Sequence, residues 1–174
     1  MNIRKVLYPM VAIPLLVIPL VAQDHDGHDR PERDFHATLR GRNEVPLTLS
    51  AGRGTLDLRV NQMDTSVHFV LTYTGLLTAV GAAHIHVAQP NVNGGVTVFF
   101  CGGGGRPACP ANGVPVEGDF TAADVIGLPT QQLEANNLDK LLAAIRAGKT
   151  YANVHTATSG GGEIRGQIEP DGRH

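Results

Sequence analysis

The chain has 174 residues, a formal net charge of −2 at pH 7, 21 glycines, 11 prolines and no tryptophan. So small a charge gives no electrostatic basis for binding nucleic acid or an anionic membrane surface. Aromatic residues make up 5% of the chain, which leaves few rings on which bases could stack, while the glycines and prolines predict frequent turns between short strands.

The first 22 residues have the features of a cleaved secretory signal. Arg4 and Lys5 precede an uncharged apolar run over residues 6–22, which ends on small residues suited to cleavage. The run is shorter than the ~20 residues that a membrane span needs, and three prolines interrupt it. We expect a periplasmic or secreted protein with no stable membrane span after signal cleavage; an uncleaved anchor is the alternative.

Residues 23–33 are charged and lack apolar periodicity, so they predict a disordered linker. Its histidines, His25 and His28, could chelate a metal loosely, but no scaffold fixes their geometry. One domain is expected over residues 34–169, followed by a C-terminal tail over residues 170–174.

Alternation of apolar and polar residues begins at Asp34 and predicts an all-β domain. In residues 34–40, for example, Phe35 and Leu39 share one face and His36 lies on the solvent-facing side. The other predicted strands cover residues 54–60, 66–76, 82–88, 95–100, 114–120, 150–157 and 162–169. Short strands separated by turns are typical of an antiparallel β-sandwich or a barrel-like domain.

A capping signal at residues 121–124 and an amphipathic pattern at residues 137–149 predict two helical pieces. In the longer piece, Asn137 can cap the start and Gly148 the end. Its apolar face consists of Leu138, Leu141, Leu142 and Ile145. We expect one short amphipathic helix that packs on the sheet through these side chains.

The cysteines Cys101 and Cys109 lie in the segment FFCGGGGRPACP. In an exported protein such a pair is expected to form a disulfide, which closes a short ring and contributes roughly 2–3 kcal/mol. The glycines in the ring let the backbone meet the bridge geometry. A soft-metal site on the two thiols is the alternative, which an oxidising compartment disfavours.

The sequence HIH places His84 and His86 on one face of a predicted strand, where two imidazoles can converge on one ion. His155, on another strand, is the best third ligand, because a metal site needs at least three. Three imidazoles would suit copper or zinc. His36 and His68 are further candidate ligands on solvent-facing strand faces. Alternatively, the histidines are structural and form internal hydrogen bonds.

Five polar residues could orient these histidines. Tyr151 and Asn153 share the strand face of His155, and metal-binding histidines are commonly held by such neighbours. Glu44, Glu163 and Arg165 could act in the same way or form an Arg–Glu network that closes the sheet. We assign no catalytic residue, because no Gly-x-Ser-x-Gly elbow or Ser-His-Asp order is present.

Three segments of the chain resemble the CHRD domain, a module first described in chordin: FHATLRGRNEVP, GLLTAVGAAHIHVA and YANVHTATSGGGEIRGQI. The resemblance covers about residues 34–169. It implies an extracytoplasmic, mostly β domain. In chordin, such modules belong to an extracellular antagonist of growth-factor signalling.

Residues 81–86 also resemble the His-x-His strand of copper-zinc superoxide dismutase. Three functions are therefore considered. The first is an exported binding module for a protein or small molecule, with a copper or zinc site on His84, His86 and His155. The second is a mononuclear copper enzyme with dismutase-like chemistry. The third is a purely structural or adhesive module.

Overall fold

The computed structural model describes residues 31–172, and the statements below concern those residues. The expected signal sequence and most of the expected linker lie outside them. Within the described range, no helix is long and apolar enough to cross a membrane. This range holds nine strands, one α-helix and three single-turn 3-10 helices.

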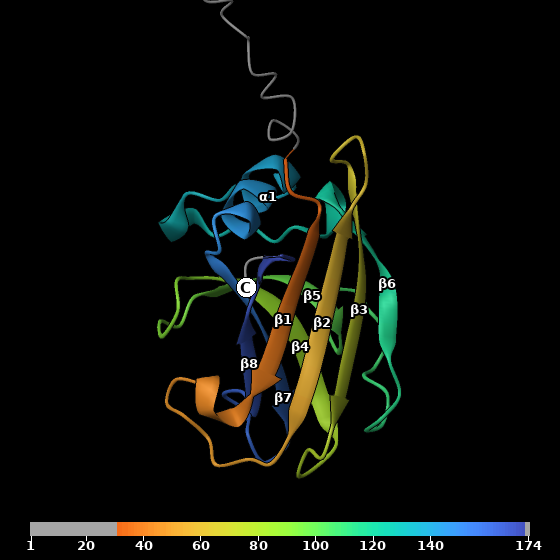
Figure 1. The fold of residues 1–174 in the computed structure, drawn as a ribbon, viewed down its shortest axis with the longest axis vertical. Helices are drawn as coiled ribbons and strands as arrows, with labels where there is room; N and C mark the ends of the chain where they lie inside the picture. Colours follow the sequence, from red (N-terminus) through yellow and green to blue (C-terminus); the bar gives the residue numbers. More distant parts are fainter. Residues whose placement is uncertain (1–30, 173–174) are drawn as a thin grey trace, which may run out of the picture. The chain divides into compact units, whose positions relative to one another are not determined.

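The strands form one antiparallel sheet in the order β5-β4-β7-β8-β1-β2-β3-β6, and β9 pairs with β1. The outermost strands, β5 and β6, approach each other without pairing, so the sheet curls into a nearly closed barrel (Figure 1). The all-β, barrel-like class is confirmed. The elements are β1 (Asp34–Arg40), η1 (Gly41–Asn43), β2 (Arg53–Val60), β3 (Ser66–Thr74), β4 (Val80–Val87), β5 (Gly95–Cys101), β6 (Val116–Thr121), η2 (Ala122–Asp124), η3 (Pro129–Gln131), α1 (Leu138–Arg146), β7 (Thr150–Thr156), β8 (Ile164–Gln167) and β9 (Glu169–Pro170).

The core follows the alternation of the sequence. Every second residue of β1, β2 and β3 is buried, and register pairs such as Leu56 with Leu71 bring apolar side chains together across the ladder. The ring of Phe69 lies 4.7 Å from that of Phe100 on β5, between their centroids. These side chains fill the interior of the barrel, because successive residues of a strand point to opposite faces.

Helix α1 lies at one end of the barrel (Figure 1). The Asn137 side chain accepts a hydrogen bond from the Lys140 backbone at 3.0 Å, and Gly148 ends the helix with φ +66°. Both capping predictions are confirmed. The four apolar residues of the predicted stripe, Leu138, Leu141, Leu142 and Ile145, are all buried.

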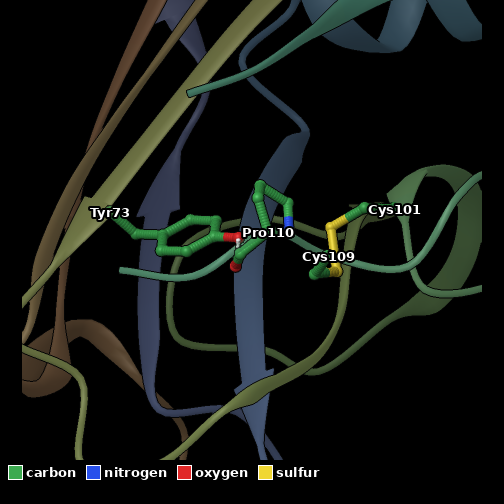
Figure 2. The surroundings of a disulfide bond; sticks show 4 residues. All are labelled: Tyr73, Cys101, Cys109 and Pro110. Atoms are coloured by element: carbon green, nitrogen blue, oxygen red, sulfur yellow. Dashed lines mark hydrogen bonds between the residues drawn. A yellow bond between two sulfur atoms is a disulfide. The ribbon is translucent and has the colours of Figure 1, made fainter. Parts of the chain in front are cut away.

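The predicted disulfide joins Cys101, at the end of β5, to Cys109, with 4.9 Å between the Cα atoms. Next to it, the Tyr73 hydroxyl donates a hydrogen bond of 2.7 Å to the Pro110 carbonyl (Figure 2). The bridge and this bond fasten the loop after β5 to β3. Within the ring, Gly102 and Gly104 adopt positive φ, which explains why glycine occupies these positions.

The middle of β4, residues 83–86, and most of β7 are buried on both faces. Ala83, Ile85 and Val154 point into the apolar core, whereas the opposite face carries polar residues that are also buried. That face is covered by the segments around residues 41–48 and 88–95, which meet where the Asn93 amide donates to the Val45 carbonyl at 2.8 Å. A second, polar layer therefore lies between these segments and the outside of the barrel.

Candidate metal centre

The polar layer brings together the three histidines that the sequence singled out. His84 and His86 lie on β4, and His155 lies on the neighbouring β7 opposite Ala82. One ring nitrogen from each of the three lies within 4.8 Å of the others. The convergence arises because alternate residues of two paired strands share one face.

Backbone carbonyls fix the orientation of two rings. His86 Nδ1 lies 2.9 Å from the carbonyl oxygen of Gly94, and His155 Nδ1 lies 3.0 Å from that of Gly160. A carbonyl only accepts, so Nδ1 of each ring carries the hydrogen and Nε2 of the neutral ring is left with a free lone pair. In each ring the nitrogen without a hydrogen, Nε2, is therefore available to a metal bound among the three histidines.

The first of these carbonyls can approach the ring only because residue 94 is glycine. A Cβ atom at Gly94 would lie 1.9 Å from the carbonyl oxygen of Val87. No side chain fits in that space, because backbone cannot move aside as a flexible side chain can. The loop after β4 can therefore fold back onto the strand and present its carbonyl to His86.

The third ring, that of His84, is held from two sides. Its Nδ1 lies 3.1 Å from His86 Nε2, and Phe99 on β5 packs edge-on against it at 4.6 Å between ring centroids. Both His84 and His86 are 7% exposed. In the absence of a cation, a hydrogen on His84 Nδ1 can point at the bare nitrogen of His86.

The amide of Asn153 faces the same centre. Its Oδ1 lies 3.0 Å from His86 Nε2 and 2.9 Å from His155 Nε2. Asn153 pairs with His84 across the β4–β7 ladder, so register places the amide among the three rings. The predicted proximity of Asn153 to the histidines is confirmed, but the amide touches their ring nitrogens directly.

The environment keeps the three imidazoles neutral. Burial, with smaller repulsions from His155 and His86, lowers the pKa of His84 from 6.5 to about 3. Burial is also the main reason that the pKa values of His86 and His155 are lowered. Neutral rings offer lone pairs, so protons compete little with a metal at pH 7.

Behind His86 lies a stack of Tyr151 and Arg165. The Tyr151 ring is parallel to that of His86 within 3°, at 4.6 Å between centroids, and the guanidinium of Arg165 lies 3.3 Å from the Tyr151 centroid. Arg165 is 2% exposed and donates to the Asn93 side chain and the Val92 carbonyl. The buried cation thus holds the tyrosine against the histidine.

The described residues contain no ion pair between Arg165 and either glutamate within 4.0 Å, although the charge of Arg165 lowers the pKa of Glu44. Backbone carbonyls and the Asn93 amide satisfy the guanidinium instead. Glu163 is fully buried and accepts hydrogen bonds from Ser50 and Thr156, both at 2.6 Å, and from the backbone of Leu77. Burial alone would raise its pKa, but these bonds lower it.

Glu44 is the one buried carboxyl of the described residues with an unpartnered oxygen. The side chain is 6% exposed, and its Oε1 has no hydrogen-bond partner. Burial raises the pKa of Glu44 from 4.5 to about 7, against the opposing charge of Arg165. A Cβ at Gly162 would lie 2.5 Å from Oε1, so the chain closes directly over the carboxyl.

His36 and His68 do not join the cluster. They lie on the outer faces of β1 and β3, where His36 contacts Asp57 at 2.8 Å and His68 contacts Asp119 at 3.1 Å. Neither strand neighbours β4 or β7 in the sheet. These exposed histidine–carboxylate pairs are surface contacts.

The cluster can be reached from solvent. His84 and His155 form part of the wall of an open pocket of about 520 Å³. The rest of the wall consists of small, uncharged residues: Ala79, Val80, Gly81, Ala82, Thr156, Ala157 and Gly160. A small ligand or ion can enter here, and chemically the arrangement offers neutral nitrogen donors and one amide oxygen.

Sequence reasoning did not identify Phe99 and Gly160 as parts of the centre. Phe99 lies opposite His84 in the β4–β5 ladder, so this contact follows from which strands pair, whereas the Gly160 carbonyl depends on the path of the loop after β7. The glycine-rich runs after His86 and His155 are the one sequence signal that loops fold back there.

The family model of the CHRD domain matches residues 35–168, which is most of the chain. Comparisons with curated proteins and with solved structures give no match. The matched range includes the three histidines and the loops that orient them. The chain belongs to the CHRD domain family.

Proposed function

We propose that this protein is an exported binding module that holds one copper or zinc ion on His84, His86 and His155. The observation that carries the proposal is the orientation of the rings. Gly94 and Gly160 accept the Nδ1 hydrogens of His86 and His155, so that the Nε2 lone pairs converge on one point. Such carbonyl partners are typical of metal-binding histidines.

The chemistry of the donors supports these two metals. Imidazole nitrogens suit copper and zinc, whereas calcium and magnesium prefer several oxygen ligands. No carboxylate contacts the three rings among the described residues. A disulfide between Cys101 and Cys109 is compatible with an oxidising, extracytoplasmic location.

A dismutase-like copper enzyme is the second candidate. The pocket beside His84 and His155 favours it, because a small molecule could reach a metal bound there. Superoxide consumption by the copper-loaded protein, compared with the same concentration of free copper, decides this point. Activity no greater than that of free copper would leave the binding role alone.

Equilibrium dialysis against limiting copper or zinc, followed by mass spectrometry of bound metal, tests the proposal. We expect one equivalent per chain in the wild type. In His86→Ala and His155→Ala we expect affinity to fall at least 100-fold, because each loses a nitrogen ligand. His68→Ala is the matched control, since it removes an imidazole from the outer face of β3.

A variant with both His25→Ala and His28→Ala separates binding by the folded domain from binding by the N-terminal segment. The proposal requires that this double variant keep its metal. Loss of binding there, or equal binding by the wild type and His86→Ala, would instead assign the cluster a structural role.

A further inference from the structure

The amide of Asn153 is placed as a ligand would be. We propose that Asn153 Oδ1 is the fourth ligand of the centre and that the four donors form a tetragonal site selective for copper(II). This inference rests on the proposed function, because it presupposes metal binding by the histidines. It adds a ligand and chooses between the two metals.

The first argument concerns lone pairs. His86 Nε2 and His155 Nε2 carry no hydrogen, because the Nδ1 hydrogens are donated to Gly94 and Gly160. Asn153 Oδ1 also has no hydrogen, yet it lies 3.0 and 2.9 Å from these two nitrogens. Three acceptors in contact repel one another unless a positive charge lies between them.

The second argument is the spacing of neighbouring donors. The separations from His84 Nδ1 to His86 Nε2, from there to Asn153 Oδ1 and on to His155 Nε2 are 3.1, 3.0 and 2.9 Å. Around an ion with bonds of about 2.05 Å, these separations correspond to angles of about 98°, about 94° and about 90°. A tetrahedral ion would require about 3.3 Å between each pair of donors.

Angles near a right angle distinguish the two metals. Structural zinc is almost always tetrahedral, whereas copper(II) with nitrogen and oxygen ligands takes square-planar or tetragonal geometry. The arrangement of the four donors around the ion, in the order His84, His86, Asn153 and His155, therefore fits copper(II) better than zinc. The amide keeps this spacing because Asn153 is fixed within β7 between two ladders.

Copper(II) and zinc affinities of the wild type and of Asn153→Leu test the proposal. Leucine has a similar shape and offers no donor. We expect copper(II) binding to weaken at least tenfold and zinc binding to change less than threefold. Water would then occupy the lost position, so pulsed electron paramagnetic resonance in D₂O should detect an additional exchangeable ligand on copper in the variant. Far-UV circular dichroism confirms folding.

Asn153→Asp keeps the oxygen and the size of the side chain, and it also serves if Asn153→Leu does not fold. Its carboxylate should tighten copper(II) binding at least tenfold and change the copper resonance spectrum. An unchanged spectrum in both variants would mean that the amide is turned over and donates its hydrogens to the rings, which overturns the inference. Absence of metal in the wild type would overturn the proposed function as well.

Discussion

Replacing Glu44 by glutamine should change how the stability of this protein depends on pH. The carboxyl is buried, one of its oxygens has no partner, and its pKa is raised from 4.5 to about 7. Between these values the native state binds a proton that the unfolded chain releases. Stability of the wild type therefore falls as pH rises through this window.

The size of the effect follows from the shift. One pKa unit corresponds to about 1.4 kcal/mol, so ionisation of Glu44 destabilises the native state by at most about 3.5 kcal/mol above pH 7. Glutamine has the shape of the neutral acid and does not ionise. Glu44→Gln should thus gain about 2–3 kcal/mol relative to the wild type between pH 5 and pH 8.

Urea unfolding of the metal-free protein at pH 5, 6, 7 and 8 measures this difference. Comparing each variant with the wild type cancels the contribution of the histidines, which has the opposite sign. Glu169→Gln removes a charge from an exposed side chain and is the matched control. If the difference between Glu44→Gln and the wild type does not grow with pH, the carboxyl is ionised in the native state and the reasoning is refuted.

Three further predictions concern the site and its scaffold. Gly94→Ala should lower the free energy of unfolding by about 2 kcal/mol or more and weaken metal binding, because its Cβ would lie 1.9 Å from a carbonyl oxygen. Urea unfolding measures the first effect and equilibrium dialysis the second. Unchanged stability and affinity would show that the loop is free to move. Reduction of the Cys101–Cys109 bridge should cost roughly 2–3 kcal/mol in urea unfolding, and an unchanged midpoint would contradict this. Burial lowers the pKa of His84 far below 6.5, so below pH 6.5 the unfolded chain binds a proton that the native imidazole does not. The free energy of unfolding of the metal-free protein should therefore fall by up to about 1.4 kcal/mol per pH unit below pH 6.5, relative to that of His84→Gln. Parallel curves of unfolding free energy against pH for the two proteins would disprove this prediction.

Much of the barrel could be predicted from the sequence because one face of most strands is apolar and the other polar. Phe35, Leu56 and Phe69 point into the core as alternation requires. The caps of α1 at Asn137 and Gly148 could also be predicted from the sequence, because capping depends on residues within a few positions of the helix ends.

Alternation was less informative for β7 and β8. It placed Asn153 on the face of His155 and Glu163 and Arg165 on the face opposite Ile164, but it did not indicate that all three residues are buried. The reason is long-range: segments from residues 41–48 and 88–95 fold over this face, and no local pattern records which loop will cover which strand. The hydrogen-bond partners of Arg165, the Asn93 side chain and the Val92 carbonyl, therefore could not be derived from the sequence.

The same distinction holds within the candidate centre. Strand period and pairing suffice to bring His84, His86 and His155 together. The carbonyls of Gly94 and Gly160 that orient the rings depend on the path of two loops. The sequence therefore predicts the donor residues, whereas the protonation of each ring nitrogen required the structure.

X-ray absorption spectroscopy of the purified, metal-loaded and desalted protein tests the central claim most directly, because it reports the metal and its ligands in one sample. We predict one bound copper or zinc ion with nearest neighbours at about 2.0 Å and the outer scattering of three imidazoles. The scattering of one imidazole should be lost in His155→Ala. No retained metal, or a spectrum without imidazole scattering, would contradict the assignment of His84, His86 and His155 as a metal centre.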